Sequence, residues 1–143
     1  MLLARGQGQA LSLRDSIMKN SMLVLGDILA ILLTTLIGFV IHSETDLSFL
    51  PRFLAAFIPL TLAWFLLAPW FGLFQPEITS NLRQLWRAPL AMLFAAPLAA
   101  TMRSALLASD AKPIFVLAFG VTSAFGLILW RATYLFLNRA RLK

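Results

Sequence analysis

The sequence predicts an all-α integral membrane protein, a bundle of four transmembrane helices. Apolar residues make up 60% of the 143-residue chain and charged residues only 13%, whereas soluble domains carry about 45–50% and about 25%. The apolar residues also fall into four runs, and each run is long enough, at about 20 residues, to cross the ~30 Å hydrocarbon layer of a bilayer. Most of the surface is therefore expected to face lipid, so the lipid bilayer is the first predicted partner.

The four predicted transmembrane helices share one feature, which is that almost no charge interrupts them. The first contains only Asp27, the second contains no charge, and the third and fourth contain Arg87, Arg103 and Arg131. Membrane strands would instead alternate apolar and polar residues over ~10 positions. The expected helices cover residues 21–41, 53–74, 85–107 and 113–137, which together form a single transmembrane domain over 21–137.

The two ends of the chain are predicted to lie outside this domain. Residues 1–20 form a cytoplasmic tail, either frayed or folded as a short helix on the membrane surface, and 138–143 form a basic cytoplasmic tail. The first apolar run is longer than the ~7–15 apolar residues of a signal peptide, so we expect it to remain as a helix. Several prolines are expected to kink the second and third helices, because each lacks an N–H: Pro59, Pro69, Pro89 and Pro97.

The basic residues predict the orientation of the bundle. With four spans, both termini lie on one side, together with nine lysines and arginines against three on the other: Arg5, Arg14, Lys19, Arg83, Arg87, Arg131, Arg139, Arg141 and Lys143 against Arg52, Arg103 and Lys112. Cytoplasmic segments carry the excess of positive charge, so both termini are expected to be cytoplasmic in the cell (plasma or inner) membrane. Trp70, Trp86 and Trp130 fall near the same side, where indoles anchor at the headgroups, and only Trp64 lies near mid-membrane.

Residue chemistry gives little support for an enzyme, so the prediction leans towards a non-enzymatic protein. No nucleotide-binding loop, carboxylate pair or catalytic triad stands out, and the absence of cysteine excludes thiol catalysis and zinc–thiolate sites. His42, the only histidine, would be the only haem ligand available, but at a helix end it is more often a solvated polar residue. We expect no cofactor and no metal. Nucleic acid is not expected either, because the basic residues of this +6 chain separate apolar runs and form no aromatic-rich patch.

The charges inside the predicted helices are the strongest candidates for a special role. A charge in lipid costs at least ~2.5–3.5 kcal/mol, so such residues usually face inward and find partners. Asp27 lies six residues inside the first helix and Arg131 six residues inside the fourth. At 1.5 Å per residue both lie about 9 Å deep, so the two can meet. Snorkelling of Arg103 and Arg131 to the headgroups, an interfacial role for Asp27, and a transport or catalytic role remain alternatives.

Small residues predict close packing of the third helix. Alanines recur along it at helical spacing, and Gly120, Ser123 and Ala124 lie in the fourth helix. Small side chains let membrane helices approach closely, so we expect the third helix to be central.

Several residues together resemble a known family. Gly26-Asp27, Gly38 with His42, Pro59 with Trp64, Gly72, Arg103, and Phe115 with Trp130-Arg131 occur in the order and spacing of the small prokaryotic membrane proteins grouped as domain of unknown function 3054. The resemblance spans about 21–137. It implies a four-helix membrane fold in bacteria or archaea and no activity. Phe39 departs from it, since many relatives are expected to have a basic residue after this glycine.

The leading functional hypothesis is a protein that acts by association, as an oligomer or as an accessory subunit of a membrane complex. It follows from the short loops, from the helix faces made of small residues and from the lack of a recognisable set of catalytic residues. One alternative is a small oligomeric transporter or channel that uses Asp27, Arg103 and Arg131. A second is a membrane enzyme that acts on lipid.

Overall fold

The computed structural model describes residues 2–42 and 46–140, and the regular structure in these residues is helical. Four helices are long: α1 (Leu2–Ile41), α2 (Leu50–Leu67), α4 (Arg87–Leu107) and α5 (Pro113–Ala140). Three short helical turns lie between them: η1 (Leu47–Phe49), α3 (Pro76–Thr79) and η2 (Leu82–Gln84). Within the described residues, these four are long and apolar enough to cross a membrane. The predicted fold class is confirmed as an all-α chain with four candidate membrane spans.

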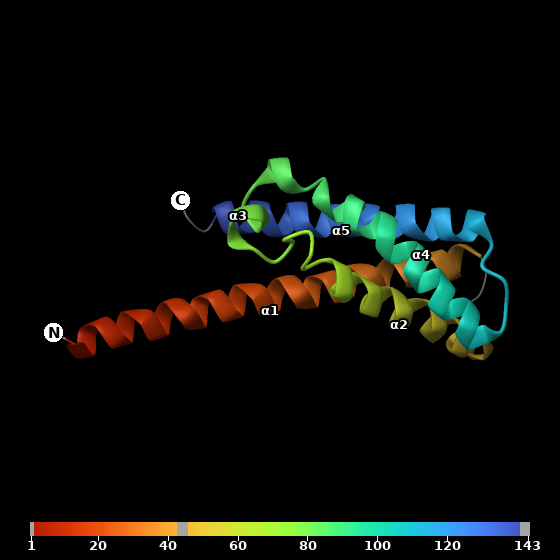
Figure 1. Cartoon of the computed structure of the whole chain (residues 1–143), viewed down its shortest axis with the longest axis horizontal. Coiled ribbons are helices and arrows are strands. Elements are labelled where there is room, and N and C mark those ends of the chain that lie inside the picture. The colour runs from red at the N-terminus through yellow and green to blue at the C-terminus, as the bar shows by residue number, and fades with distance from the viewer. Residues whose placement is uncertain (1, 43–45, 141–143) are drawn as a thin grey trace.

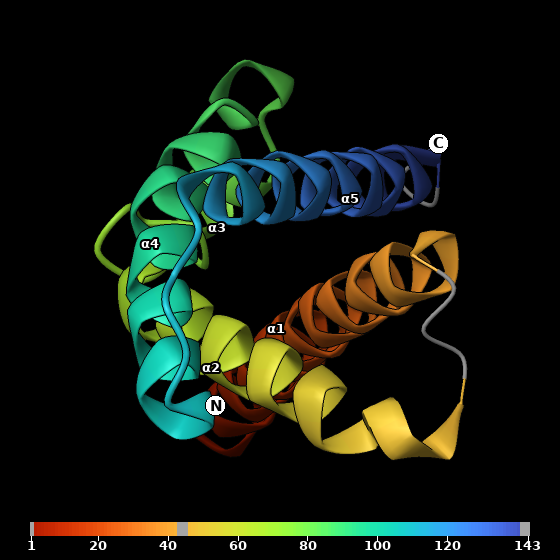
Figure 2. The same ribbon diagram turned by 90° about the vertical axis from the view of Figure 1, so that its right-hand side faces the viewer.

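The four long helices surround one core. Each packs against the next in the order α1, α2, α4 and α5, and α5 returns to pack against α1 (Figure 2). Both ends of the described chain lie at the same end of the bundle, together with α3 (Figure 1). We call this the terminal end. The opposite end, where α1 leads to α2 and α4 leads to α5, is the connecting end.

The core is centred on one face of α4, as predicted from its small residues. This alanine face is fully buried and packs between α2 and α5; it consists of Ala88, Ala91, Ala95, Ala96, Ala99 and Ala100. Leu60 and Trp64 of α2 and Leu127 of α5 fill the space around it. Alanine leaves little side chain between the helix axes, so the neighbouring helices can approach closely.

The predicted end of the second helix, at residue 74, is wrong. α2 ends at Leu67, because Pro69 has no N–H to continue the helical ladder and Gly72 takes the left-handed conformation, with φ +69°. Leu73 N then donates to Ala68 O (3.1 Å) and Gly72 N to Pro69 O (2.9 Å). This is the Schellman pattern of hydrogen bonds, and it satisfies the carbonyls of Ala68 and Pro69 in the turn that follows α2. The residues after Leu67 remain apolar, so hydropathy alone could not locate the break.

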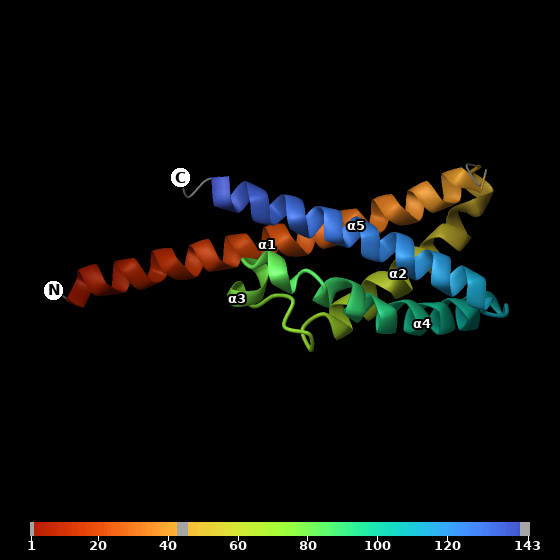
Figure 3. The same ribbon diagram turned by 90° about the horizontal axis from the view of Figure 1, so that it is seen from above.

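The other long helices differ from their predicted bounds mainly at the terminal end. α1 begins at Leu2, so residues predicted as a separate tail or surface helix form its first turns and extend beyond the bundle (Figure 3). α5 continues to Ala140, and residues 141–143 of the predicted basic tail lie outside the described residues. α4 begins at Arg87, and its Pro89 lies in the first turn, where a missing N–H matters least.

Candidate functional site

The ion pair predicted from matched depths is formed. Arg131 of α5 donates from Nη2 to Asp27 Oδ2 at 2.6 Å and from Nε to Asp27 Oδ1 at 3.2 Å. Asp27 is 0% exposed and Arg131 is 5% exposed. Two parallel N–H···O bonds are the geometry in which a guanidinium holds a carboxylate most strongly. Snorkelling of Arg131 to the headgroups, one of the alternatives, is therefore wrong for this side chain.

A third donor completes the environment of the carboxylate. Trp64, which is fully buried in α2, donates from Nε1 to Asp27 Oδ2 at 3.0 Å. From the sequence, Trp64 is a candidate only by its depth in the membrane, and this bond is not predicted. The available signal was that an indole N–H buried in mid-membrane needs an acceptor, and Asp27 is the only carboxylate within the predicted spans.

The break after α2 supplies the remaining partner of Arg131. Leu73 O, at the end of the Schellman pattern, accepts from Arg131 Nη1 at 2.7 Å. The rings of Trp64 and Phe74 lie near the guanidinium, each with its centroid 5.5 Å from Cζ. The non-helical backbone therefore lies at the depth of the ion pair and contributes a carbonyl to it. Irregular backbone at membrane depth is tolerated where protein buries it in this way.

A second arginine holds the same segment from the terminal end. Arg87, in the first turn of α4, donates from Nη1 to Phe71 O at 3.0 Å and from Nε to Gln84 Oε1 at 2.7 Å. Two carbonyls of the loop after α2 thus accept bonds from arginines of two different helices. We call Asp27, Trp64, the Leu73 carbonyl and Arg131 the polar cluster.

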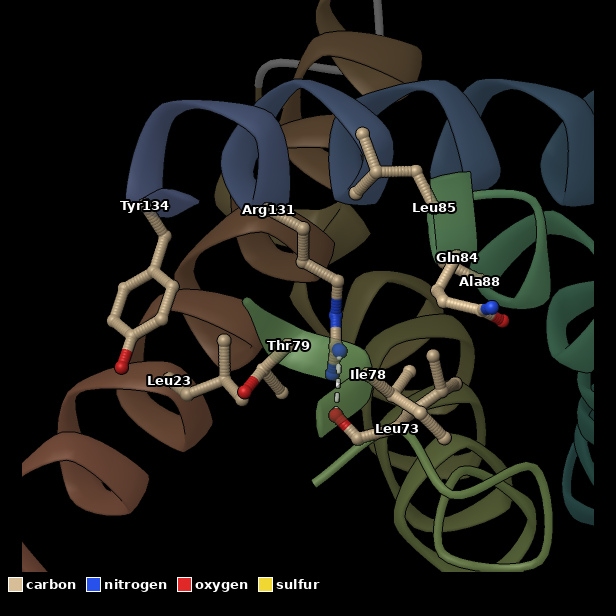
Figure 4. Close-up of a pocket in the computed structure, with 9 residues that line it drawn as sticks. All are labelled: Leu23, Leu73, Ile78, Thr79, Gln84, Leu85, Ala88, Arg131 and Tyr134. Atoms are coloured by element: carbon tan, nitrogen blue, oxygen red, sulfur yellow. Dashed lines mark hydrogen bonds between the residues drawn. The ribbon is translucent and has the colours of Figure 1, made fainter. Parts of the chain in front are cut away.

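A small cavity opens beside the polar cluster at the terminal end (Figure 4). Arg131 points into it from α5, with Tyr134 and Leu23 on one side and Gln84 and Leu85 on the other. The space open to the centre of a water molecule is about 10 Å³, which is close to the minimum that one water needs. It is too small for a metabolite or a lipid headgroup.

The prediction that three tryptophans anchor the protein at the headgroups is wrong for Trp130. Trp70 is 85% exposed and Trp86 is also exposed, as expected of anchors. Trp130 instead packs over Gly26, where a Cβ atom would overlap its six-membered ring. Its Nε1 is buried and has no acceptor among the described residues. The glycine beside Asp27 therefore serves close contact between α1 and α5.

The family model described as "Protein of unknown function (DUF3054)" matches residues 24–134, which is most of the chain. The chain belongs to this family. No curated protein and no solved structure matches it. The matched region of this DUF3054 chain includes the whole polar cluster, whereas the part of α1 that extends beyond the bundle lies outside it.

The structure does not bring the remaining candidates of this DUF3054 chain to the polar cluster. Arg103 lies near the connecting end of α4, with its guanidinium 4.6 Å from the centroid of Phe115. His42 is exposed at the connecting end, just after α1. Glu44, two residues after His42 in the sequence, lies outside the described residues. The charges considered for a transport path are thus divided between opposite halves of the bundle.

An apolar groove of about 530 Å³ lies between α4 and α5 of the DUF3054 chain. Every side chain that lines it is apolar, from Pro89 and Leu93 of α4 to Val116 and Val121 of α5. Substrate and cofactor sites usually place a few polar groups within such a lining to orient the ligand. The side chains of this groove therefore provide no polar group for a reaction.

Proposed function

We propose that this protein is non-enzymatic and acts by association with other membrane proteins, as an oligomer or as an accessory subunit. The observation that carries this proposal is the internal satisfaction of the polar cluster. Asp27 accepts three hydrogen bonds from protein donors, and Arg131 uses its guanidinium on that carboxylate and on a backbone carbonyl. Catalytic and transport residues need a group left over for the substrate.

The alternatives have weaker support. A transport path needs polar groups that follow one another across the membrane, but Arg103 and Arg131 lie in opposite halves of the bundle. The lipid-acting enzyme would depend on the exposed His42, which has no carboxylate partner among the described residues. By contrast, all four long helices expose large apolar side chains on the outside, a surface open both to lipid and to the helices of another membrane protein.

Native mass spectrometry after extraction in a mild detergent tests the proposal. The chain has a mass of 15.9 kDa. We expect a complex that contains either several copies or one copy with other membrane subunits. A protein that remains a single copy under every mild condition would contradict association, and flux catalysed by that single copy in vesicles would favour the transporter.

We also propose the orientation with both termini in the cytoplasm, in the plasma or inner membrane. Its support is the excess of lysine and arginine at the terminal end. Reporter fusions after Ser48 and after Lys143 should report opposite sides, with the second in the cytoplasm. Reporters on the same side would refute the four-span topology, and a cytoplasmic reporter after Ser48 would reverse the orientation.

A further inference from the structure

We infer that two copies of this chain associate in parallel through α1, along an apolar stripe that runs from the membrane into the N-terminal extension. This inference rests on the proposed function and names its partner, a second copy. The stripe consists of Leu11, Asp15, Met18, Met22, Leu25, Leu29, Leu32 and Leu36.

The length of α1 is the first reason. Its 40 residues span about 60 Å at 1.5 Å per residue, roughly twice the hydrocarbon thickness of a bilayer. Among the described residues, the hydrogen bond to another helix that lies nearest the start of α1 is donated by Tyr134 Oη of α5 to Lys19 O, at 3.2 Å. Before that point α1 continues away from the other helices (Figures 1 and 3).

The exposure of this extension is the second reason. All residues in 8–22 are exposed, including Leu11, Ile17 and Met18. A lone helix of this length is marginal in water, because most helical stability in proteins comes from packing of an apolar face. A partner that covers one face would supply that packing.

The spacing of the stripe indicates what the partner is. Its positions are separated alternately by four and three residues, and seven of the eight are apolar. That is the a/d heptad repeat, which keeps one seam facing an equivalent helix over its whole length. Seven of the eight side chains are exposed and Leu32 is half-buried, so the stripe lies on the face of α1 that the bundle leaves free.

The one charge on the stripe is compatible with a parallel pair. Two copies inserted in the same membrane have parallel α1 helices, and a two-fold axis brings each stripe position near its equivalent. In the heptad assignment, Asp15 occupies an a position and Arg14 the preceding g position. The a position of one parallel helix lies beside the g position of the other, so each Asp15 faces an arginine. These two pairs of Asp15 with Arg14, one on each side of the interface, offset the repulsion between the two Asp15 carboxylates.

Disulfide crosslinking tests the inference on the full chain in native membranes. The chain has no cysteine, so each variant carries one thiol. Leu11→Cys and Met18→Cys lie on the stripe, whereas Leu13→Cys and Ile17→Cys lie off it in the same extension. Leu11, Leu13 and Ile17 are 62%, 63% and 64% exposed and Met18 is 52% exposed, so Leu11→Cys is matched to the two controls and all four thiols are accessible. Under mild oxidation we expect several-fold more dimer from the stripe variants.

A charge variant adds an independent measurement. In the Leu11→Cys background, Asp15→Lys places like charges along the seam and should reduce crosslinking, while Asp15→Leu should increase it. Neither change touches the polar cluster, so folding of the bundle should be preserved.

Three outcomes overturn the inference, and they separate it from the proposed function. Equal crosslinking on and off the stripe, with native masses that still show a complex, would refute the α1 pair and leave association intact. A complex with other subunits but only one copy of this chain would do the same. A single copy by both methods would refute both proposals.

Discussion

The polar cluster and the alanine face of α4 lie in the same bundle but depend on different physics. The cluster consists of directional bonds around two buried charges, Asp27 and Arg131. The alanine face has no polar side chain and works through close approach of helices. Because lipid tails are as apolar as a core, membrane helices gain little from hydrophobic burial and rely on packing and polar contacts. The cluster should therefore be sensitive to removal of atoms, and the alanine face to their addition.

The largest expected effect comes from removing one charge of the cluster. Asp27→Ala and Arg131→Ala should each lower the unfolding free energy by about 3–5 kcal/mol, because the remaining charge is buried without compensation. The measurement is thermal denaturation in detergent. Arg139→Ala is the matched control, since this arginine is exposed near the end of the same helix and lies 3.5 Å from its only described acceptor. If all three variants melt together, the cluster is not what holds α1 to α5.

A smaller effect is expected from enlarging the alanine face. Ala95→Leu or Ala99→Leu should destabilise the protein by about 1–3 kcal/mol through overpacking. Leu93→Ala, at an exposed position of the same helix, should change stability by less than about 0.5 kcal/mol. The reverse order of these effects, measured by the same melting assay, would mean that the packing described for α4 is wrong.

The lengths of the apolar runs predicted most of the fold, and the matched depths of Asp27 and Arg131 predicted the ion pair. Both quantities follow from the sequence by simple geometry. They could not predict the end of α2, because the residues around Gly72 are as apolar as the helix before them. They also missed the bond from Trp64 to Asp27, which needs the rotation of α2 about its own axis. The exposed stripe on α1 could not be predicted from the sequence for a related reason. Nearly every position of a membrane helix is apolar, so only the burial of each residue in the structure shows which face the bundle leaves exposed.

The smallest effect is expected at the break after α2. Gly72→Ala places a side chain on a residue with φ +69°, which costs about 1–2 kcal/mol. The new Cβ would also lie 2.6 Å from Ile78 Cδ1, the flexible tip of a side chain. Gly38→Ala is the control, because nothing lies within 4 Å of its Cβ position. Equal melting temperatures for the two variants would show that the left-handed turn is not required.

A double-mutant cycle on Asp27 and Arg131 tests directly whether these two buried charges satisfy each other or are reserved for a substrate. Asp27→Ala combined with Arg131→Ala leaves no charge in the cluster. The double variant should therefore lose clearly less stability than the sum of the single losses, with a coupling of about 0.5–3 kcal/mol. Losses that add, together with separate effects of each residue on ion or solute flux, would show that Asp27 and Arg131 do not satisfy each other.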